Sequence, residues 1–135
     1  MPQRLKLVFD LDGTLIDSAP DIRAAANDLL QSLDRAPLSI EDTRRFVGEG
    51  SAVFVDRMMA ERSIERAPGR HAELLRQFVQ RLSTTVHSGE FYAGVPGLLE
   101  ELRSAGYPMA ICTNKPEPAA EAVVAHMGLD RVFPV

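Results

Sequence analysis

Two short apolar segments, each ending in polar side chains, most constrain what this chain can fold into. The first, residues 5–9, has the sequence LKLVF and leads directly into Asp10 and Asp12, and the second, residues 108–114, has the sequence PMAICTN. The first segment is almost entirely apolar, which is typical of a parallel strand covered on both faces. Because helical patterns lie between and after these two strands, the sequence predicts an open α/β fold with a parallel sheet.

Helical periodicity fills most of the stretch between the two strands. Apolar residues recur at the spacing of one helical face, and Pro, Ser and Gly mark the helix ends. The predicted helices begin at or near Pro20, Ser39, Ser51 and Leu74, with a polar loop over residues 62–70. Residues 15–91 are far longer than a single crossover connection requires. We therefore expect them to form a separate all-helical cap.

The remaining segments are expected to form the sheet-containing part of the molecule. Residues 1–14 and 92–135 hold both predicted strands, together with helices from about Pro96 to Ala105 and from about Pro116 to Met127. Two strands make only a partial sheet, so the predicted architecture is an incomplete, Rossmann-like α/β core with an inserted helical cap.

Composition excludes several classes of protein. The formal charge is −4 at pH 7 and the basic residues are scattered, which argues against a nucleic-acid-binding surface. There is no apolar run long enough to cross a bilayer and no secretory-signal pattern at the N-terminus. The single cysteine, Cys112, excludes an internal disulfide, so a reducing, cytoplasmic location is the default expectation. Its position in an apolar run predicts a buried packing residue.

The end of the first strand carries two carboxylates that point the same way. Asp10 and Asp12 are two residues apart in an extended segment, so both can face one site, where their charges repel unless a cation lies between them. Ligands of open α/β sheets bind at the carboxyl ends of the strands. Mg²⁺ is commonly held by one or two carboxylates together with a substrate phosphate. The two aspartates therefore predict a Mg²⁺ and phosphate site.

Residues next to both strand ends are suited to binding phosphate. Gly13 lets the backbone approach a ligand closely, and Thr14 offers a short hydroxyl and an amide. Thr113, Asn114 and Lys115 end the second strand. A lysine at a helix N-terminus opposes the helix dipole, and a bound anion relieves that conflict.

The segment DLDGTLIDS at residues 10–18, the segment TNKP at residues 113–116 and the helical stretch between them resemble the haloacid dehalogenase-like hydrolase superfamily, and within it the phosphoglycolate phosphatases. The resemblance implies a Mg²⁺-dependent phosphatase acting on a small phosphomonoester such as 2-phosphoglycolate. It implies that Asp10 is the nucleophile forming an aspartyl-phosphate and that Asp12 is the general acid and base. Mg²⁺ would be bound by the Asp10 carboxylate and the Asp12 backbone carbonyl, and Thr113 and Asn114 would bind the phosphoryl group.

The helical stretch resembles the cap domain of that superfamily, which closes over the site. Its candidate substrate contacts lie in RRFVGEG, at Arg45, Gly48 and Gly50. Arg45 could pair with a substrate carboxylate, and a solvent-exposed Arg with no ligand is about equally expected. Gly48 and Gly50 could equally serve only to end one helix and begin the next.

The sequence departs from the family pattern at its C-terminal end. Family members continue further and there supply a phosphate-binding lysine, additional acidic metal ligands and more strands. We therefore expect either a fragment of a longer enzyme or a chain that associates with itself through the unpaired edge of its sheet. A catalytically incomplete relative that binds phosphate or a partner chain, and a sugar phosphomutase, remain open as alternatives.

Overall fold

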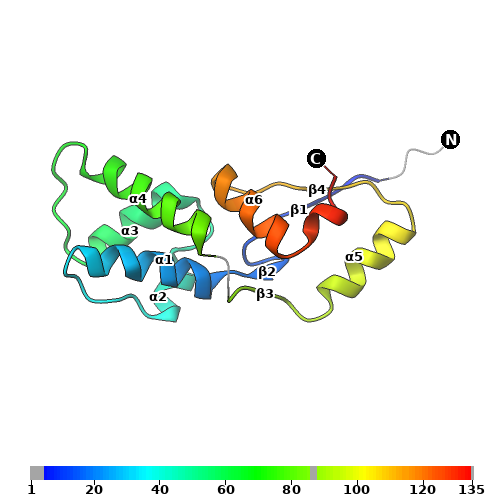
Figure 1. The fold of residues 1–135 in the computed structure, drawn as a ribbon, viewed down its shortest axis with the longest axis horizontal. Helices are drawn as coiled ribbons and strands as arrows, with labels where there is room; N and C mark the ends of the chain where they lie inside the picture. The colour runs from blue at the N-terminus through cyan, green and yellow to red at the C-terminus, as the bar shows by residue number, and fades with distance from the viewer. Residues whose placement is uncertain (1–4, 86–87, 135) are drawn as a thin grey trace.

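The structure, a computed structural model, describes residues 5–85 and 88–134, and Figure 1 shows two groups of elements next to each other. One group holds strands β1 (Leu7–Phe9) and β4 (Met109–Ile111) with helices α5 (Val95–Ser104) and α6 (Glu117–His126) and the 3-10 helix η1 (Leu129–Arg131). The other holds helices α1 (Ala19–Ser32), α2 (Ile40–Phe46), α3 (Ser51–Glu61) and α4 (Arg70–Thr84). No helix among the described residues is long and apolar enough to cross a membrane.

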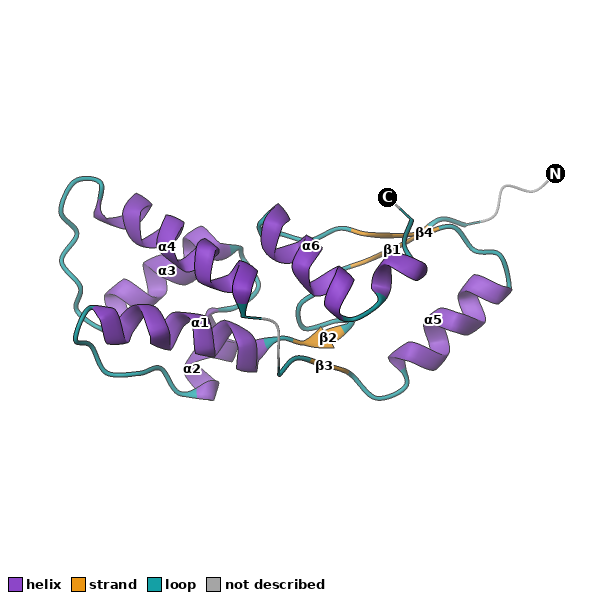
Figure 2. Ribbon diagram, viewed as in Figure 1, coloured by secondary structure: helices purple, strands orange, loops and turns teal. Residues whose placement is uncertain are grey.

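Strands β1 and β4 pair in parallel, which confirms the predicted α/β class. The register places Val8 opposite Ala110, and the Cys112 amide donates to the Phe9 carbonyl oxygen at 2.8 Å. Figure 2 shows this small sheet with α6 and η1 on one side of it. The pairing brings the residues that follow the two strands to the same edge of the sheet.

Only one face of the β1–β4 sheet is covered by described residues. Phe9, Met109 and Ile111 point into an apolar cluster with side chains from α5, α6 and η1. On the other face, Val8 is 65% exposed and Cys112 is exposed. The expectations that the first strand is covered on both faces and that Cys112 is buried are therefore wrong for the described residues, because side chains alternate between the faces of a strand.

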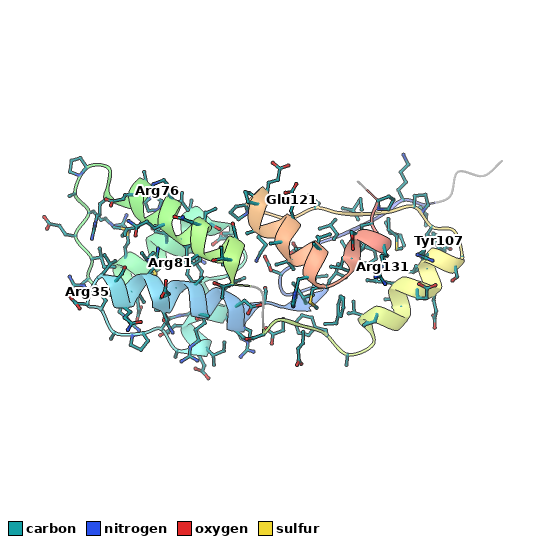
Figure 3. The ribbon with its side chains drawn as sticks, viewed as in Figure 1. Arg35, Arg76, Arg81, Tyr107, Glu121 and Arg131 are labelled. Atoms are coloured by element: carbon teal, nitrogen blue, oxygen red, sulfur yellow. The ribbon has the colours of Figure 1, made fainter. Side chains whose placement is uncertain are left out.

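The helical group has its own apolar core. Phe54 of α3 stacks on Phe78 of α4, with ring centroids 4.9 Å apart, and apolar side chains of α1 pack around them. Figure 3 shows Arg81 of α4 next to α1, and its guanidinium donates to Asp28 of that helix at 2.6 Å. The predicted helices over this stretch are confirmed within a few residues at their ends.

A second pair of strands joins the two groups and was not predicted. Strand β2 (Ile16–Asp17) pairs antiparallel with β3 (Glu90–Phe91), so the expectation of only two strands, with nothing but helices between them, is wrong. Two residues are too few to show the alternating pattern by which a strand is recognised in a sequence. The short pair holds together the outgoing and returning connections between the sheet and the helices (Figure 2).

The Asp21 side chain adds hydrogen bonds between the outgoing and the returning connection. It lies in the first turn of α1, is buried, and accepts hydrogen bonds from the backbone amides of Ser88 and Gly89 at 2.9 Å each. A Cβ at Gly89 would lie 2.9 Å from the nearer carboxylate oxygen of Asp21. A side chain at Gly89 would therefore force the Asp21 carboxylate or the backbone to shift.

We expect Gly89→Ala to lower the free energy of unfolding by about 1–3 kcal/mol, because the added methyl displaces a carboxylate that accepts two hydrogen bonds. The matched control is Gly97→Ala in α5, where a Cβ meets nothing within 4 Å and which should be stabilising by about 0.5–1 kcal/mol. Urea unfolding followed by circular dichroism measures both. Equal stability of the two variants would contradict the proposed role of the Asp21 contact.

Candidate active site

The loop after β1 holds Asp10 and Asp12 on either side of the fully buried Leu11. The carbonyl oxygen of Leu11 accepts hydrogen bonds from the amides of Leu15 and Ile16 at 3.0 and 3.3 Å. Neighbouring side chains in an extended segment point in opposite directions, so burial of Leu11 turns both carboxylates away from the core. The turn continues through Gly13, whose φ of +79° favours glycine.

The end of β4 supplies the second half of the site. The Thr113 hydroxyl accepts a hydrogen bond from the Lys115 amide at 3.1 Å, which closes a tight turn before α6. Pro116 then precedes the first residue of that helix. The hydrogen bond between the strands, from the Cys112 amide to the Phe9 carbonyl, fixes this turn next to the β1 loop.

A small cavity, partly open to solvent, lies between the two groups of elements. The sheet group contributes Asp10, Asp12, Thr113, Asn114 and Lys115 to its wall. The helical group contributes Ile22, Val47, Gly48, Gly50, Ser51, Phe54, Phe78 and Leu82. All the charged side chains of the wall thus come from the two strand ends, and the helices contribute mainly apolar groups.

Asp12 forms an ion pair with Lys115 inside this cavity. The lysine Nζ lies 3.1 Å from one carboxylate oxygen of Asp12 and 3.3 Å from the other. Only 5% of the Lys115 side chain and 15% of the Asp12 side chain are exposed. For Asp10, the hydrogen bond that the structure describes comes from the Leu11 amide at 2.8 Å. The cation therefore neutralises one of the two neighbouring carboxylates.

The donor set of the cavity fits Mg²⁺ only when a ligand supplies further oxygen atoms. Asp10 offers a carboxylate, and Thr113 and Asn114 offer neutral oxygens, whereas both carboxylate oxygens of Asp12 contact Lys115. Among the described residues no group of three or more His, Cys, Asp or Glu side chains is placed to hold a metal ion. Mg²⁺ bound by one carboxylate and phosphate oxygens is an ordinary arrangement, so the residues suit a metal that arrives with a phosphorylated ligand.

The structure brings together most of the predicted site residues, with three exceptions. Gly13 and Thr14 are exposed in the β1 loop and do not line the cavity. Arg45 lies on the outer side of α2, where its guanidinium is 2.8 Å from Asp42 and 3.5 Å from Glu61. The structure thus pairs Arg45 with these acidic residues and does not place it in the cavity wall, and its contact with a substrate stays a prediction.

Several wall residues were not predicted as site residues from the sequence. Phe54, Phe78 and Leu82 have the helical spacing of ordinary core positions, so nothing in the sequence separates them from other buried residues. Ser51 is the first residue of α3 and follows Gly50, whose φ is +90°. A Cβ at Gly50 would lie 3.7 Å from the Asn114 Cβ, so this turn is the place where the helical group approaches the end of β4.

Several proteins with similar sequences are named phosphoglycolate phosphatase. The chain is 41% identical over 127 residues to a phosphoglycolate phosphatase of Rhodobacter capsulatus, covering 94% of this chain and 58% of the relative. It is 38% identical over 131 residues to a phosphoglycolate phosphatase of Pseudomonas fluorescens, covering 94% of this chain and 47% of that protein. The chain thus spans about half the length of these relatives.

Solved structures share the fold. A crystal structure described as a predicted phosphoglycolate phosphatase from Haemophilus somnus superposes with a TM-score of 0.86 at 27% identity, covering 99% of this chain and 62% of the other. CbbY from Rhodobacter sphaeroides, solved in complex with phosphate, gives a TM-score of 0.78 at 22% identity, covering 97% of this chain and 61% of the other. At that identity the second likeness shows the fold alone.

The family match extends over nearly the whole sequence. Residues 7–135 match the hydrolase family described as haloacid dehalogenase-like hydrolase. The matched region includes both strands of the parallel sheet, the two aspartates after β1 and the polar turn after β4, which together form one wall of the cavity. The chain belongs to the haloacid dehalogenase-like hydrolase family.

Proposed function

We propose that this protein is a Mg²⁺-dependent phosphatase that hydrolyses a small phosphomonoester, with 2-phosphoglycolate as the first candidate substrate. The observation that carries the proposal is the meeting of Asp10 and Asp12 with Thr113 and Asn114 at one cavity, at the carboxyl ends of two parallel strands. The relatives named phosphoglycolate phosphatase support the choice of substrate. Carboxylate nucleophiles are well suited to capturing a phosphoryl group.

In the proposed reaction, an Asp10 carboxylate oxygen attacks phosphorus while the bond from phosphorus to the alcohol oxygen of the substrate breaks. Asp12, in its protonated form, gives a proton to that departing oxygen, which leaves an aspartyl-phosphate on Asp10 and Asp12 as the carboxylate that contacts Lys115. Asp12 then takes a proton from water, and the water oxygen attacks phosphorus, releasing inorganic phosphate and restoring Asp10. Thr113 and Asn114 orient the phosphoryl oxygens throughout, because positioning and charge stabilisation dominate this chemistry. When bound, Mg²⁺ would offset the negative charge of Asp10 and the phosphate.

The helical group is proposed to act as the cap of this site. Its wall of Ile22, Phe54, Phe78 and Leu82 is apolar, so a substrate held under it is shielded from bulk water. Within the predicted cap of residues 15–91, the backbone at Gly48 and Gly50 and the side chain of Ser51 form the polar part of the cavity wall. We propose that the backbone of this turn, and not Arg45, contacts the part of the substrate beyond its phosphate.

Phosphate binding without turnover is the second candidate function. It is favoured by the small number of acidic groups, since Asp10 and Asp12 are the only carboxylates that the described residues contribute to the cavity wall. A site with this donor set binds Mg²⁺ weakly unless phosphate contributes further ligands.

The deciding experiment measures inorganic phosphate released from 2-phosphoglycolate and a panel of phosphomonoesters, with Mg²⁺ and with a chelator. We expect Mg²⁺-dependent turnover that Asp10→Asn lowers by roughly 10³-fold or more, since the nucleophile is lost. The matched control is Asp130→Asn in η1, at an exposed position outside the cavity. A folded, phosphate-binding chain without turnover would support the second candidate instead.

Arg45→Gln is expected to leave the Kd for 2-phosphoglycolate within about twofold of the parent, because its guanidinium contacts Asp42 and Glu61 and not the cavity. Titration calorimetry in an Asp10→Asn background measures binding without turnover. Thr113→Val, a substitution of similar size in the cavity wall, should weaken binding clearly. A tenfold loss with Arg45→Gln would place that side chain in the site after all.

The exposed face of the sheet is the proposed site of self-association. Leu5, before β1, and Val8, within it, are 73% and 65% exposed, and among the described residues β1 pairs only with β4, an arrangement that favours pairing with another chain. We expect Val8→Lys to lower the sedimentation-average mass, whereas Leu98→Lys, at a 49% exposed position on α5, should leave it unchanged. A parent chain that is monomeric at all concentrations would contradict this proposal.

A further inference from the structure

The ion pair between Lys115 and Asp12 differs from the others in the described part of the chain. Both of its side chains are largely buried, whereas each of the other ion pairs has at least one side chain that is a quarter or more exposed. It joins residues 103 positions apart and so links the end of β1 to the end of β4. Ion pairs on the surface contribute little, but removing one partner of a buried pair leaves an uncompensated charge.

Both partners of this pair are held by rigid parts of the fold. Asp12 follows the buried Leu11 in a turn closed by backbone hydrogen bonds. Lys115 is fixed by the hydrogen bond from its amide to the Thr113 hydroxyl and by the start of α6 immediately after it. Only 5% of the Lys115 side chain is exposed, so the surrounding atoms leave it little freedom to adopt another rotamer.

We propose that Lys115 is a positioning residue for Asp12. Its ammonium holds both carboxylate oxygens and fixes the orientation of the carboxylate toward the cavity, so Lys115 acts on the reaction through Asp12 and does not itself bind the phosphoryl group. The inference rests on the proposed function, in which Asp12 transfers protons. It adds a specific role for a lysine whose sequence position suggested only an attraction for phosphate.

The geometry favours this role over direct phosphate binding. Two short contacts, at 3.1 and 3.3 Å, join the ammonium to both carboxylate oxygens of Asp12 and use up to two of its three N–H donors. A phosphate that took Lys115 away would leave the mostly buried Asp12 carboxylate without its cation. Breaking such a pair is costly, so the bound lysine is expected to stay with Asp12 when a phosphorylated ligand enters.

The first test uses the fact that Lys6 and Lys115 are the only lysines in the sequence. Both amines compete for a limiting acylating reagent, and peptide mass spectrometry follows each of them separately, with the exposed Lys6 as the internal control. We expect Lys115 to react about tenfold more slowly than Lys6 in the parent and to lose most of that protection in Asp12→Asn, with Lys6 unchanged. Unchanged protection of Lys115 in Asp12→Asn would overturn the proposal.

Repeating the labelling experiment with added inorganic phosphate tests whether Lys115 binds the anion directly. In the Asp12→Asn variant, added phosphate should leave the reactivity of Lys115 unchanged, because the lysine does not bind the anion. Renewed protection of Lys115 by phosphate in that variant would identify it as a direct phosphate ligand and overturn the proposal. This measurement needs no catalysis, so it shows whether Lys115 contacts Asp12 or phosphate even if the proposed function fails.

The second test is a double-mutant cycle on hydrolysis of 2-phosphoglycolate. Lys115→Met should lower kcat about tenfold or more in the parent and no more than about twofold in the Asp12→Asn background, with KM changed little in both. Lys115→Arg should restore part of kcat, and Lys6→Met is the matched control. An equal loss in both backgrounds, or a loss confined to KM, would overturn the proposal.

Folding of the variants is followed by thermal melting, because Lys115→Met leaves Asp12 buried without its cation. The double variant Asp12→Asn/Lys115→Met removes both charges and should melt above Lys115→Met alone. A lower melting temperature with unchanged kcat per folded molecule would show a purely structural ion pair and overturn the proposal. Absence of turnover in the parent would count against the proposed phosphatase and not against the labelling result.

Discussion

The parallel pairing of β1 with β4 is the constraint on which the rest of the structure depends. The two strands are separated by about a hundred residues in the sequence, and their hydrogen bonds place the turn after Phe9 next to the turn after Ile111. Because parallel strands end at the same edge of a sheet, each strand delivers its polar residues to one place. The carboxylate pair, the hydroxyl and amide side chains and the buried lysine all meet for this reason.

The chemistry of the site follows from how its charges are balanced. Two carboxylates two residues apart repel each other in a partly buried cavity, and the ammonium of Lys115 neutralises the one at Asp12. In the proposed reaction, Asp10 is then the carboxylate left for the phosphorylated ligand and its metal. The helical group adds no charged side chain to this wall, so it shapes and shields the cavity while the strand ends supply its electrostatics.

Specific contacts also hold the connection between the two groups of elements. The chain leaves the sheet through β2 and returns through β3, and Asp21 holds the returning backbone at Ser88 and Gly89. These contacts fix where α1 begins and how the helices lie over the strand ends. In this arrangement the turn at Gly50 approaches the end of β4, where an added Cβ would lie 3.7 Å from the Asn114 Cβ.

The sequence by itself determined the α/β class, the helices and the residues that end each strand, because these follow from local periodicity and from the short segments DLDGT and TNK. It could not predict the two-residue strands β2 and β3, which are too short to carry a pattern. Tertiary structure alone decided the ion pairs between separate elements. Packing of α2 near α3 places Arg45 next to Glu61, and strand pairing places Lys115 next to Asp12, because side chains distant in sequence meet only once the backbone has folded.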